Sequence, residues 1–437
     1  MAETAREIAV LALAACERQG AWSEGLLKQA IGDAALDSRD AAFATRICAG
    51  VLQNRLLLNF YISQYSSIMP AKLEPKVRCA LQIGIYQMLM MDRVPHSAAV
   101  NESVNLARRY SKNPKAPGLV NGVLRNISRA ENLPKPKDLS TQYSHPDWLV
   151  KAFRLAVGEG ELEALLAADN REPPIYAQTN LCRSTTSALL EKLAGEGVAA
   201  QAHPWLPDCL ELSDTGDMTR LQSFRDGDFY VQDPAARWAV LAADPKPGMR
   251  VLDACAAPGG KSVAAAIAME NKGEIMSCDI HENKLPLIAG SAKRLGLTCI
   301  ETMVQDGKTE RPDWREGFDL VLADVPCSGL GVIRKKPDIR YKDPKPLAGL
   351  PAVQAAILEN LAGYVKPGGG LLYSTCTLVR AENEAIVRAF TAKHKDFTLE
   401  AFRCPQGMRE EETGMLTFFP HRQDTDGFFI AKLRKNR

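Results

Sequence analysis

From about residue 245 onward, short apolar runs of β type alternate with stretches whose apolar residues recur at helical spacing. The strand-like runs span residues 250–254, 274–279, 299–305, 318–324, 370–374, 397–401 and 427–433. Strands that alternate with helices form βαβ units, so this pattern predicts a mostly parallel, doubly wound sheet. The last two runs lie close together along the chain, and we expect them to form an antiparallel pair at an edge. Ligands bind beyond the carboxyl ends of the strands in such a sheet, so functional residues are expected there.

The first 130 residues follow a helical pattern throughout. Their apolar residues recur at helical spacing in residues 8–15, 43–52, 56–62, 77–90, 100–106 and 118–127. Turn-forming prolines, among them Pro70, Pro75 and Pro95, separate these runs. The pattern predicts an all-α bundle.

A polar segment with spaced prolines, residues 131–138, marks the clearest domain boundary. Beyond it, residues 146–157 and 161–168 have helical spacing, and helix mixed with short strands follows up to about residue 235. A chain of 437 residues is long enough for two or three separate cores. We therefore expect a helical domain over residues 1–140, a small α/β module over 141–235 and the α/β sheet domain over 236–437.

The formal net charge of +2 does not decide whether the chain binds nucleic acid, because a basic surface can lie within a nearly neutral total. Between residues 103 and 137, eight basic residues stand against the single acid Glu131. The basic residues are Arg108, Arg109, Lys112, Lys115, Arg125, Arg129, Lys135 and Lys137. Such a cluster is either a solvated helix face or a stripe that contacts RNA phosphates, and the sequence leaves both interpretations open.

Eleven cysteines are scattered along the chain without a CxxC pair. An odd, dispersed set in a large protein is typical of reduced thiols and not of a disulfide framework or a zinc site, so we expect no metal. The N-terminal residues lack a signal-peptide pattern, and no apolar run reaches the ~18 residues of a membrane span. We expect a cytoplasmic protein that acts as a monomer without a membrane.

A glycine-containing loop follows the first predicted strand of the sheet domain. It comprises Ala254, Cys255, Ala256, Ala257, Pro258, Gly259, Gly260 and Lys261, and a helix follows. Small residues let the backbone approach a ligand, and a helix N-terminus offers free amides. The spacing matches neither GxGxxG nor a P-loop, whose first glycine would have to be Cys255.

Acidic residues end the second and third predicted strands. Asp279 stands about twenty residues past the glycines, where an acid commonly accepts hydrogen bonds from the ribose of an adenosine-type cofactor. Asp306 is placed to reach an adenine edge or the cofactor's amino group. Either acid alone could instead be a helix cap. Together with the glycine loop, the pair predicts a site for S-adenosylmethionine.

Two cysteines and an acid follow the fourth and fifth predicted strands. Asp324 and Cys327 end one strand, and Cys376 ends the other. A lone cysteine at a strand end is usually structural, but two at neighbouring strand ends would converge on one crevice beside the cofactor.

Methylation of cytosine at C5 explains why such a crevice would hold two thiols and an acid. C5 is a poor nucleophile, but addition of a thiolate to C6 turns the ring into an enamine whose C5 can attack a methyl sulfonium. Asp324, protonated or sharing a proton, would stabilise the charge that develops at N3. The base must leave its stack to enter the crevice, which favours a loop or single-stranded RNA.

Three motifs closely resemble the RNA cytosine-C5 methyltransferases of the Sun/Fmu family. They are Asp-Ala-Cys-Ala-Ala-Pro-Gly-Gly-Lys-Ser at 253–262, Asp-Val-Pro-Cys-Ser-Gly at 324–329 and Ser-Thr-Cys-Thr at 374–377. The resemblance covers residues 145–437 and implies that Cys376 is the nucleophile and Cys327 the thiol that aids product release. It also implies that the 254–261 loop, Asp279, Asp306 and Asp324 line the cofactor site, with Asp324 facing the cytosine. DNA cytosine methyltransferases use a Pro-Cys cysteine, which would select Cys327 instead.

The N-terminal part resembles the RNA-binding antitermination factor NusB. The resemblance rests on Pro-His-Ser-Ala-Ala-Val-Asn-Glu-Ser-Val at 95–104 and Gly-Leu-Val-Asn-Gly-Val-Leu-Arg-Asn at 118–126. With Tyr-Ser-His-Pro-Asp-Trp-Leu at 143–149, the fusion is similar to the bacterial 16S rRNA methyltransferase B group. That group's activity is on cytosine 967 of 16S rRNA. One departure is Gln178, which stands where relatives carry an arginine expected to contact RNA.

Two other functions remain open on the residues alone. Methylation of DNA or of a nitrogen would keep the cofactor, but nitrogen methylases end the corresponding strand with Asn/Asp-Pro-Pro-Tyr/Phe, which residues 324–327 do not match. A non-catalytic RNA-binding assembly factor would keep the fold as a scaffold. Such a scaffold would not need Cys376, Cys327 and Asp324 together.

Overall fold

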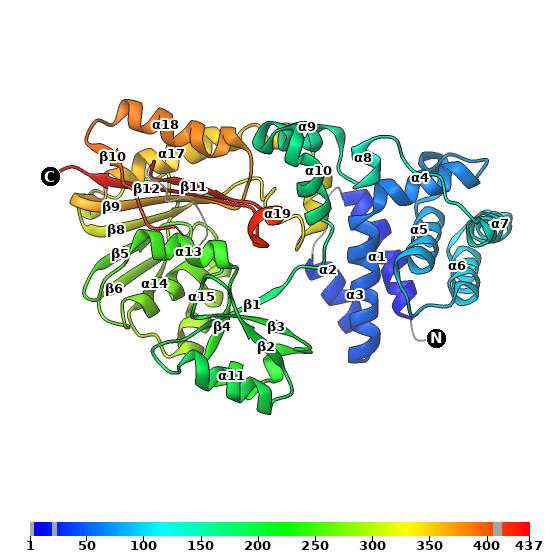
Figure 1. Ribbon diagram of the computed structural model, residues 1–437, viewed down its shortest axis with the longest axis horizontal. Coiled ribbons are helices and arrows are strands. Elements are labelled where there is room, and N and C mark those ends of the chain that lie inside the picture. The colour runs from blue at the N-terminus through cyan, green and yellow to red at the C-terminus, as the bar shows by residue number, and fades with distance from the viewer. Residues whose placement is uncertain (1–3, 20–23, 405–412) are drawn as a thin grey trace. The chain divides into compact units, whose positions relative to one another are not determined.

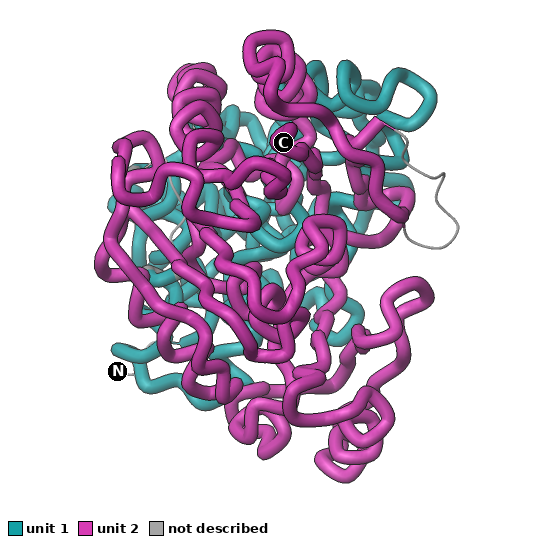
Figure 2. Tube along the Cα trace, turned by 90° about the vertical axis from the view of Figure 1, so that its left-hand side faces the viewer, with its two compact units in different colours: residues 1–171, 333–344 teal, residues 172–332, 345–437 magenta. Residues whose placement is uncertain are grey.

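The structure is a computed structural model that describes residues 4–19, 24–404 and 413–437. Its described residues form two compact units, which Figure 2 shows in different colours. The first unit runs to Arg171 and also includes Ile333–Pro344, and the second comprises Glu172–Val332 and Lys345–Arg437. Residues 141–171, which the sequence groups with the middle module, thus form part of the first unit.

The first unit is a bundle of helices (Figure 1). They are α1 (Ala5–Gln19), α2 (Glu24–Asp33), α3 (Ser38–Gln53), α4 (Arg55–Tyr65), α5 (Pro75–Met90), α6 (His96–Tyr110), α7 (Ala116–Arg129), α8 (Leu139–Gln142), α9 (Asp147–Val157) and α10 (Glu159–Ala168). The predicted all-α bundle is confirmed, and α2 is a helix that the periodicity did not indicate. Among the described residues no helix has both the length and the apolar character needed to cross a membrane.

Helix α5 is the central helix of this bundle. It is apolar on nearly all sides and packs against α1, α3, α4, α6 and α7. Gly84 permits the closest approach, because a Cβ there would lie 2.6 Å from Ser103 Oγ and 2.7 Å from Leu124 Cδ1. A larger residue at this position would force α6 and α7 away from α5.

A segment from the second half of the chain, residues 333–344, completes the first unit. It contains the short 3-10 helix η5 (Pro337–Tyr341), and the Arg340 side chain is fully buried. The guanidinium donates to oxygens that lie 2.9–3.4 Å away, namely those of Gln53 O, Tyr143 O, Ser144 O, Asp169 O and Asn170 Oδ1. One side chain therefore satisfies carbonyl groups at the ends of three helices, and this contact fastens the segment into the unit.

Replacing Arg340 by Met should destabilise the helices that its guanidinium joins. The buried carbonyl oxygens would lose their donors, which predicts a loss of about 2–4 kcal/mol in the local opening free energy. Hydrogen exchange of amides in α3 and α8–α10 measures this loss. Lys336→Met, at an exposed position in the same segment, is the matched control. Equal protection in the two variants would contradict a role for Arg340 in holding the unit.

The second unit contains the predicted doubly wound sheet, with strand order β10-β12-β9-β8-β5-β6-β7. The strands are β5 (Arg250–Asp253), β6 (Glu274–Asp279), β7 (Ile300–Val304), β8 (Phe318–Asp324), β9 (Val365–Thr375), β10 (Phe397–Leu399), β11 (Met415–Phe418) and β12 (Phe428–Lys435). Strands β7, β6, β5, β8 and β9 are parallel. The predicted antiparallel pairing of the last two runs is confirmed as β10–β12. Strand β12 also pairs with β9 and with β11, a strand that the sequence did not indicate.

Helices cover both faces of this sheet, as Figure 1 shows. On one face lie α13 (Pro234–Ala243), α14 (Gly260–Ala268) and α15 (Leu285–Leu295), and on the other α17 (Leu350–Ala362) and α18 (Glu384–Lys393). Parallel strands buried on both faces carry near-continuous apolar sequence, which is why they were recognisable in the sequence.

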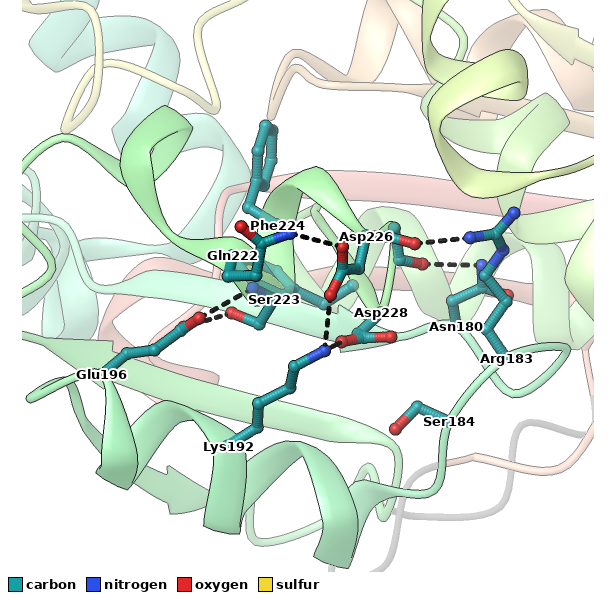
Figure 3. Close-up of polar contacts among 12 residues, drawn as sticks. Asn180, Arg183, Ser184, Lys192, Glu196, Gln222, Ser223, Phe224, Asp226 and Asp228 are labelled. Atoms are coloured by element: carbon teal, nitrogen blue, oxygen red, sulfur yellow. Dashed lines mark hydrogen bonds and ion pairs between the residues drawn. The ribbon is translucent and has the colours of Figure 1, made fainter.

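The middle module forms a separate antiparallel sheet of order β2-β3-β1-β4. Its strands are β1 (Ile175–Thr179), β2 (Ala199–Ala202), β3 (Cys209–Ser213) and β4 (Phe229–Val231), and α11 (Thr186–Gly195) packs on one face. Figure 3 shows Lys192 of α11 bound to Asp226 at 2.8 Å and to Asp228 at 2.5 Å. These ion pairs tie the helix to the turn before β4.

Buried polar groups join this module to the sheet domain within the second unit. Asn180 Nδ2 donates to Gly227 O at 2.8 Å and to Leu295 O at 2.9 Å. Arg294 of α15 donates to two carbonyls of the module, and its guanidinium lies 3.8 Å from the centre of the Phe224 ring. The module is therefore docked through directional contacts.

Gln178 lies inside the module and not on an RNA-facing surface. Its side chain is buried, and Nε2 donates to Gln232 O at 3.0 Å and to Cys209 Sγ at 3.2 Å. Gln178, which replaces the arginine of relatives, therefore makes internal contacts in this chain. A buried amide between β1 and β3 serves packing, because an exposed contact with phosphate requires access to solvent.

Candidate active site

The carboxyl ends of the parallel strands meet at one edge of the sheet. Strand β5 is central there, with β6 and β7 on one side and β8 and β9 on the other. The chain thus changes direction next to β5, which is the position at which doubly wound sheets bind ligands. The structure brings the glycine loop, the two acids and the cysteine-bearing loops predicted from the sequence to this edge.

The glycine loop has a backbone that approaches a ligand closely. Gly259 adopts φ +106° and caps α14, whose first amides lack helical partners. A Cβ on Gly259 would lie 3.2 Å from atoms of Ile288, so glycine is required both for conformation and for space. Such a loop presents backbone N–H groups to a polar or charged ligand.

Acids lie at or just after the ends of the next two strands, and Asp306 Oδ2 lies 3.6 Å from Lys308 Nζ. Asp279 Oδ1 accepts a hydrogen bond from His281 N at 2.9 Å, and Asp306 Oδ1 accepts one from Lys308 N at 3.0 Å. Ile280 and Leu287, at the end of β6 and the start of α15, are exposed apolar side chains. Carboxylates can accept hydrogen bonds from ribose hydroxyl groups, and exposed apolar side chains can contact a purine ring. These residues therefore fit the adenosyl part of S-adenosylmethionine.

Asp253 is a site residue that the sequence reasoning passed over. It ends β5 directly before the glycine loop, and its side chain is buried. Its Oδ2 accepts a hydrogen bond from Ser262 Oγ at 2.7 Å, whereas Oδ1 has no partner among the described residues. Burial raises the pKa of Asp253 to about 6. The search for acids at the carboxyl ends of strands, which singled out Asp279 and Asp306, would also have found Asp253.

Asp324 lies between two polar side chains at the end of β8. Lys261 Nζ is 2.6 Å from Asp324 Oδ2, and Ser374 Oγ donates to Oδ1 at 2.8 Å. The Lys261 ammonium also lies 4.8 Å from the centre of the Phe428 ring. Lys261, expected only to line the cofactor loop, thus connects that loop to the acid beside the cysteines.

The two predicted cysteines are neighbours, with Cys327 Sγ and Cys376 Sγ 3.3 Å apart. Parallel pairing of β8 with β9, in which Asp324 lies opposite Ser374, brings the two loops together. A hydrogen bond from Cys327 lowers the pKa of Cys376, and Lys261 adds to this effect, while burial opposes it. The same contact, together with burial, raises the pKa of Cys327. Two thiols this close favour a state in which one is ionised and accepts a hydrogen bond from the other.

This combination of fold and strand-end residues defines a Rossmann-like, class I methyltransferase domain. Its residues 240–434 match the family model of the 16S rRNA methyltransferase RsmB/F. Residues 3–129 match the NusB family, and 145–219 match the ferredoxin-like domain of RsmF/B-like methyltransferases.

Whole-chain relatives agree with these matches. The chain is 37% identical to the probable ribosomal RNA small subunit methyltransferase B of Bacillus subtilis, with 98% of each chain covered. It is 33% identical to the Klebsiella pneumoniae ribosomal RNA small subunit methyltransferase B over 94% of this chain and 93% of that one. The crystal structure of PH0851 superposes with a TM-score of 0.81 at 26% identity, covering all of both chains. The chain belongs to the family of ribosomal RNA small subunit methyltransferase B.

Replacing Asp253 by Asn should flatten the pH dependence of unfolding. The folded protein holds the Asp253 proton up to about pH 6, whereas an unfolded aspartate loses it near 3.9, roughly. The contribution of Asp253 to stability is therefore fully present below about pH 4 and is lost as pH rises through about 6. A difference of about two between the folded and unfolded pKa values corresponds to about 3 kcal/mol of stability.

Urea unfolding between pH 4 and 7 measures this change in the wild type and in the variant. Asp244→Asn, at an exposed position of the same unit, is the matched control and should retain the wild-type slope. If Asp253→Asn also retains that slope, another group carries the pH dependence.

Proposed function

We propose that this protein methylates C5 of a cytosine in 16S rRNA through a covalent bond between Cys376 and C6 of the base. The observation that carries the proposal is the pair of thiols 3.3 Å apart beside the Lys261–Asp324 ion pair. By family resemblance, the target is cytosine 967. The comparisons support an rRNA substrate, and the two thiols favour C5 as the methylated atom.

Cys376 is the proposed nucleophile. Its lowered pKa favours the thiolate, which is the form that adds to C6. Addition places electron density at C5 and negative charge at N3. Without this step C5 would not attack a methyl group.

The Lys261–Asp324 pair is placed to hold the charge at N3. Lys261 Nζ donates to Asp324 Oδ2 at 2.6 Å, and Ser374 Oγ, which donates to Oδ1 at 2.8 Å, fixes the orientation of the carboxyl group. We propose that Asp324 takes a proton from the Lys261 ammonium and presents it to N3 as the adduct forms. A hydrogen bond made in a partly buried site is stronger than one made in water.

Cys327 is proposed to act when the adduct breaks down. Bonding of Cys376 to C6 removes the neighbouring thiolate charge, which is one cause of the raised pKa of Cys327. Cys327 can then release its proton to solvent, and its thiolate takes the proton from C5. As the C6–sulfur bond breaks and the C5–C6 double bond returns, N3 gives its proton back to Asp324 and Cys376 leaves as a thiolate.

S-adenosylmethionine supplies the methyl group in this proposal. The loop at 254–261 would hold its charged end, Asp279 its ribose and Asp306 its adenine or amino group. Asp324 would line the side that faces the base. These assignments rest on the positions of the residues at the sheet edge.

The first unit is proposed to capture RNA. All eight basic residues of the 108–137 segment are exposed, and Arg109 forms an ion pair with Glu7. The target base must enter the crevice unstacked, which favours a loop cytosine. Both active-site thiols must stay reduced, so we place the reaction in the cytoplasm.

The order of chemical steps separates the two cysteines. Replacing Cys376 by Ala should abolish methylation and leave no protein–RNA adduct. Replacing Cys327 by Ala should permit attack and methyl transfer but slow release, so a denaturant-resistant complex should accumulate. Gel electrophoresis with labelled cofactor and 16S rRNA transcripts, followed by mapping of 5-methylcytosine, measures both results.

Cys404→Ala, which removes another half-buried cysteine of the second unit, is the control and should behave as the wild type. A trapped complex with the Cys376 variant would reverse the two roles. Full activity in both variants would show that the reaction does not use a covalent bond to either cysteine. No methylation by the wild type would favour a non-catalytic assembly factor.

Replacing Arg108, Arg109 and Lys112 together by Ala should weaken RNA binding in a salt-dependent way. Neutralised phosphates release counterions, so the slope of log affinity against log salt should become shallower by about 1–3. Filter binding over a range of salt concentrations measures the slope.

A matched triple variant, Lys246, Lys272 and Lys293 to Ala, removes three exposed positive charges from the second unit. It should change the slope less than the first variant. Equal slopes in the two triple variants would show that the first cluster is a solvated helix face and not an RNA-binding surface.

A further inference from the structure

Glu382 is a buried carboxylate at the end of the 3-10 helix η6 (Arg380–Glu382), and the reaction described above does not use it. Only 3% of the residue is exposed. Its oxygens accept hydrogen bonds from Ser328 N at 2.9 Å, Ser328 Oγ at 2.6 Å, Gln354 Nε2 at 2.9 Å and Thr377 Oγ1 at 3.4 Å. These four donors are neutral, so they stabilise the carboxylate without cancelling its charge.

The partners of Glu382 adjoin both cysteines. Ser328 follows Cys327, and Thr377 follows Cys376 in the chain. The two hydroxyl groups also contact each other, with Ser328 Oγ 2.8 Å from Thr377 Oγ1. One carboxylate therefore binds the residue next to each thiol.

Asn383 extends this clamp to the other side of Cys376. Its Oδ1 accepts from Thr375 Oγ1 at 2.6 Å, and its Nδ2 donates to Thr377 O at 2.9 Å. Tyr373 Oη donates to the Glu382 backbone carbonyl at 2.6 Å, which anchors η6 to β9. The cysteine loops are thus held to one rigid turn that precedes α18.

The charges around the two thiols are unequal. The groups that face the pair are Asp324, Lys261, Asp426, Glu382 and Tyr373. The Glu382 charge raises the pKa of Cys327, whereas around Cys376 the Asp324 and Asp426 charges raise the pKa and the Lys261 charge lowers it. The Glu382 charge therefore favours the protonated form of Cys327.

We propose that Glu382 is a positioning residue that holds Cys327 against Cys376 and keeps the shared proton on Cys327. Two chemically identical thiols thereby take different roles: Cys376 becomes the thiolate and Cys327 its hydrogen-bond donor. The inference deepens the proposed function, on which the roles of the thiols rest.

Glu382→Gln separates charge from shape. Its amide oxygen can accept from Ser328 N and Gln354, and its NH2 group can donate to the two hydroxyl groups, so the clamp keeps its connections. Only the negative charge is lost. Cys327 should then ionise more readily, and the difference between the two thiols should shrink.

The experiment is alkylation of the full-length protein by iodoacetamide between pH 6 and 9, with initial rates at each cysteine read by mass spectrometry. In the wild type Cys376 should react faster than Cys327. In Glu382→Gln the ratio of the two rates should fall about tenfold, the effect of one pKa unit. Glu384→Gln, which neutralises the next acid at the start of α18, is the matched control and should keep the wild-type ratio.

An unchanged ratio in Glu382→Gln would overturn the proposal. Thermal melting of each variant shows that the fold is kept, and Glu382→Asp, which restores the charge, should return the ratio towards the wild-type value. The assay uses neither RNA nor cofactor. A lack of methylation on 16S rRNA would therefore count against the proposed function alone, and an unchanged ratio against Glu382 alone.

Discussion

Parallel pairing between β8 and β9 is the constraint on which the active site depends. It places Asp324 opposite Ser374 and carries the two cysteine loops off the same edge of the sheet. Because side chains alternate between the faces of a strand, a shift of one residue would turn these side chains to opposite faces. The apolar cores on both faces fix the register and therefore bring the two sulfur atoms within 3.3 Å.

Burial of the two thiols strengthens the effect of neighbouring charges on their pKa values. In water, two thiols with equal neighbours would titrate alike, but here Glu382 raises the pKa of Cys327, whereas Lys261 lowers and Asp426 raises that of Cys376. Charges interact more strongly in a site from which water is largely excluded. The proposed difference between the two thiols thus arises from the surroundings and not from the residue type.

The chain path links the active site to the helical unit. Directly after the Cys327 loop, residues 333–344 leave the sheet domain and enter the first unit, where Arg340 is buried among carbonyl groups. The chain then returns to form α17.

The sequence by itself determined the fold class and several strand ends, and it placed the candidate site residues at those ends, because apolar periodicity and strand-end motifs are local signals. The bounds of β6 and β8 follow directly from these signals. Only the tertiary structure decided the burial of Gln178, the insertion of β12 beside β9, the Lys261–Asp324 pair and the Glu382 clamp. Each of these depends on contacts between residues that are distant in the sequence, and a local pattern carries no information about such contacts.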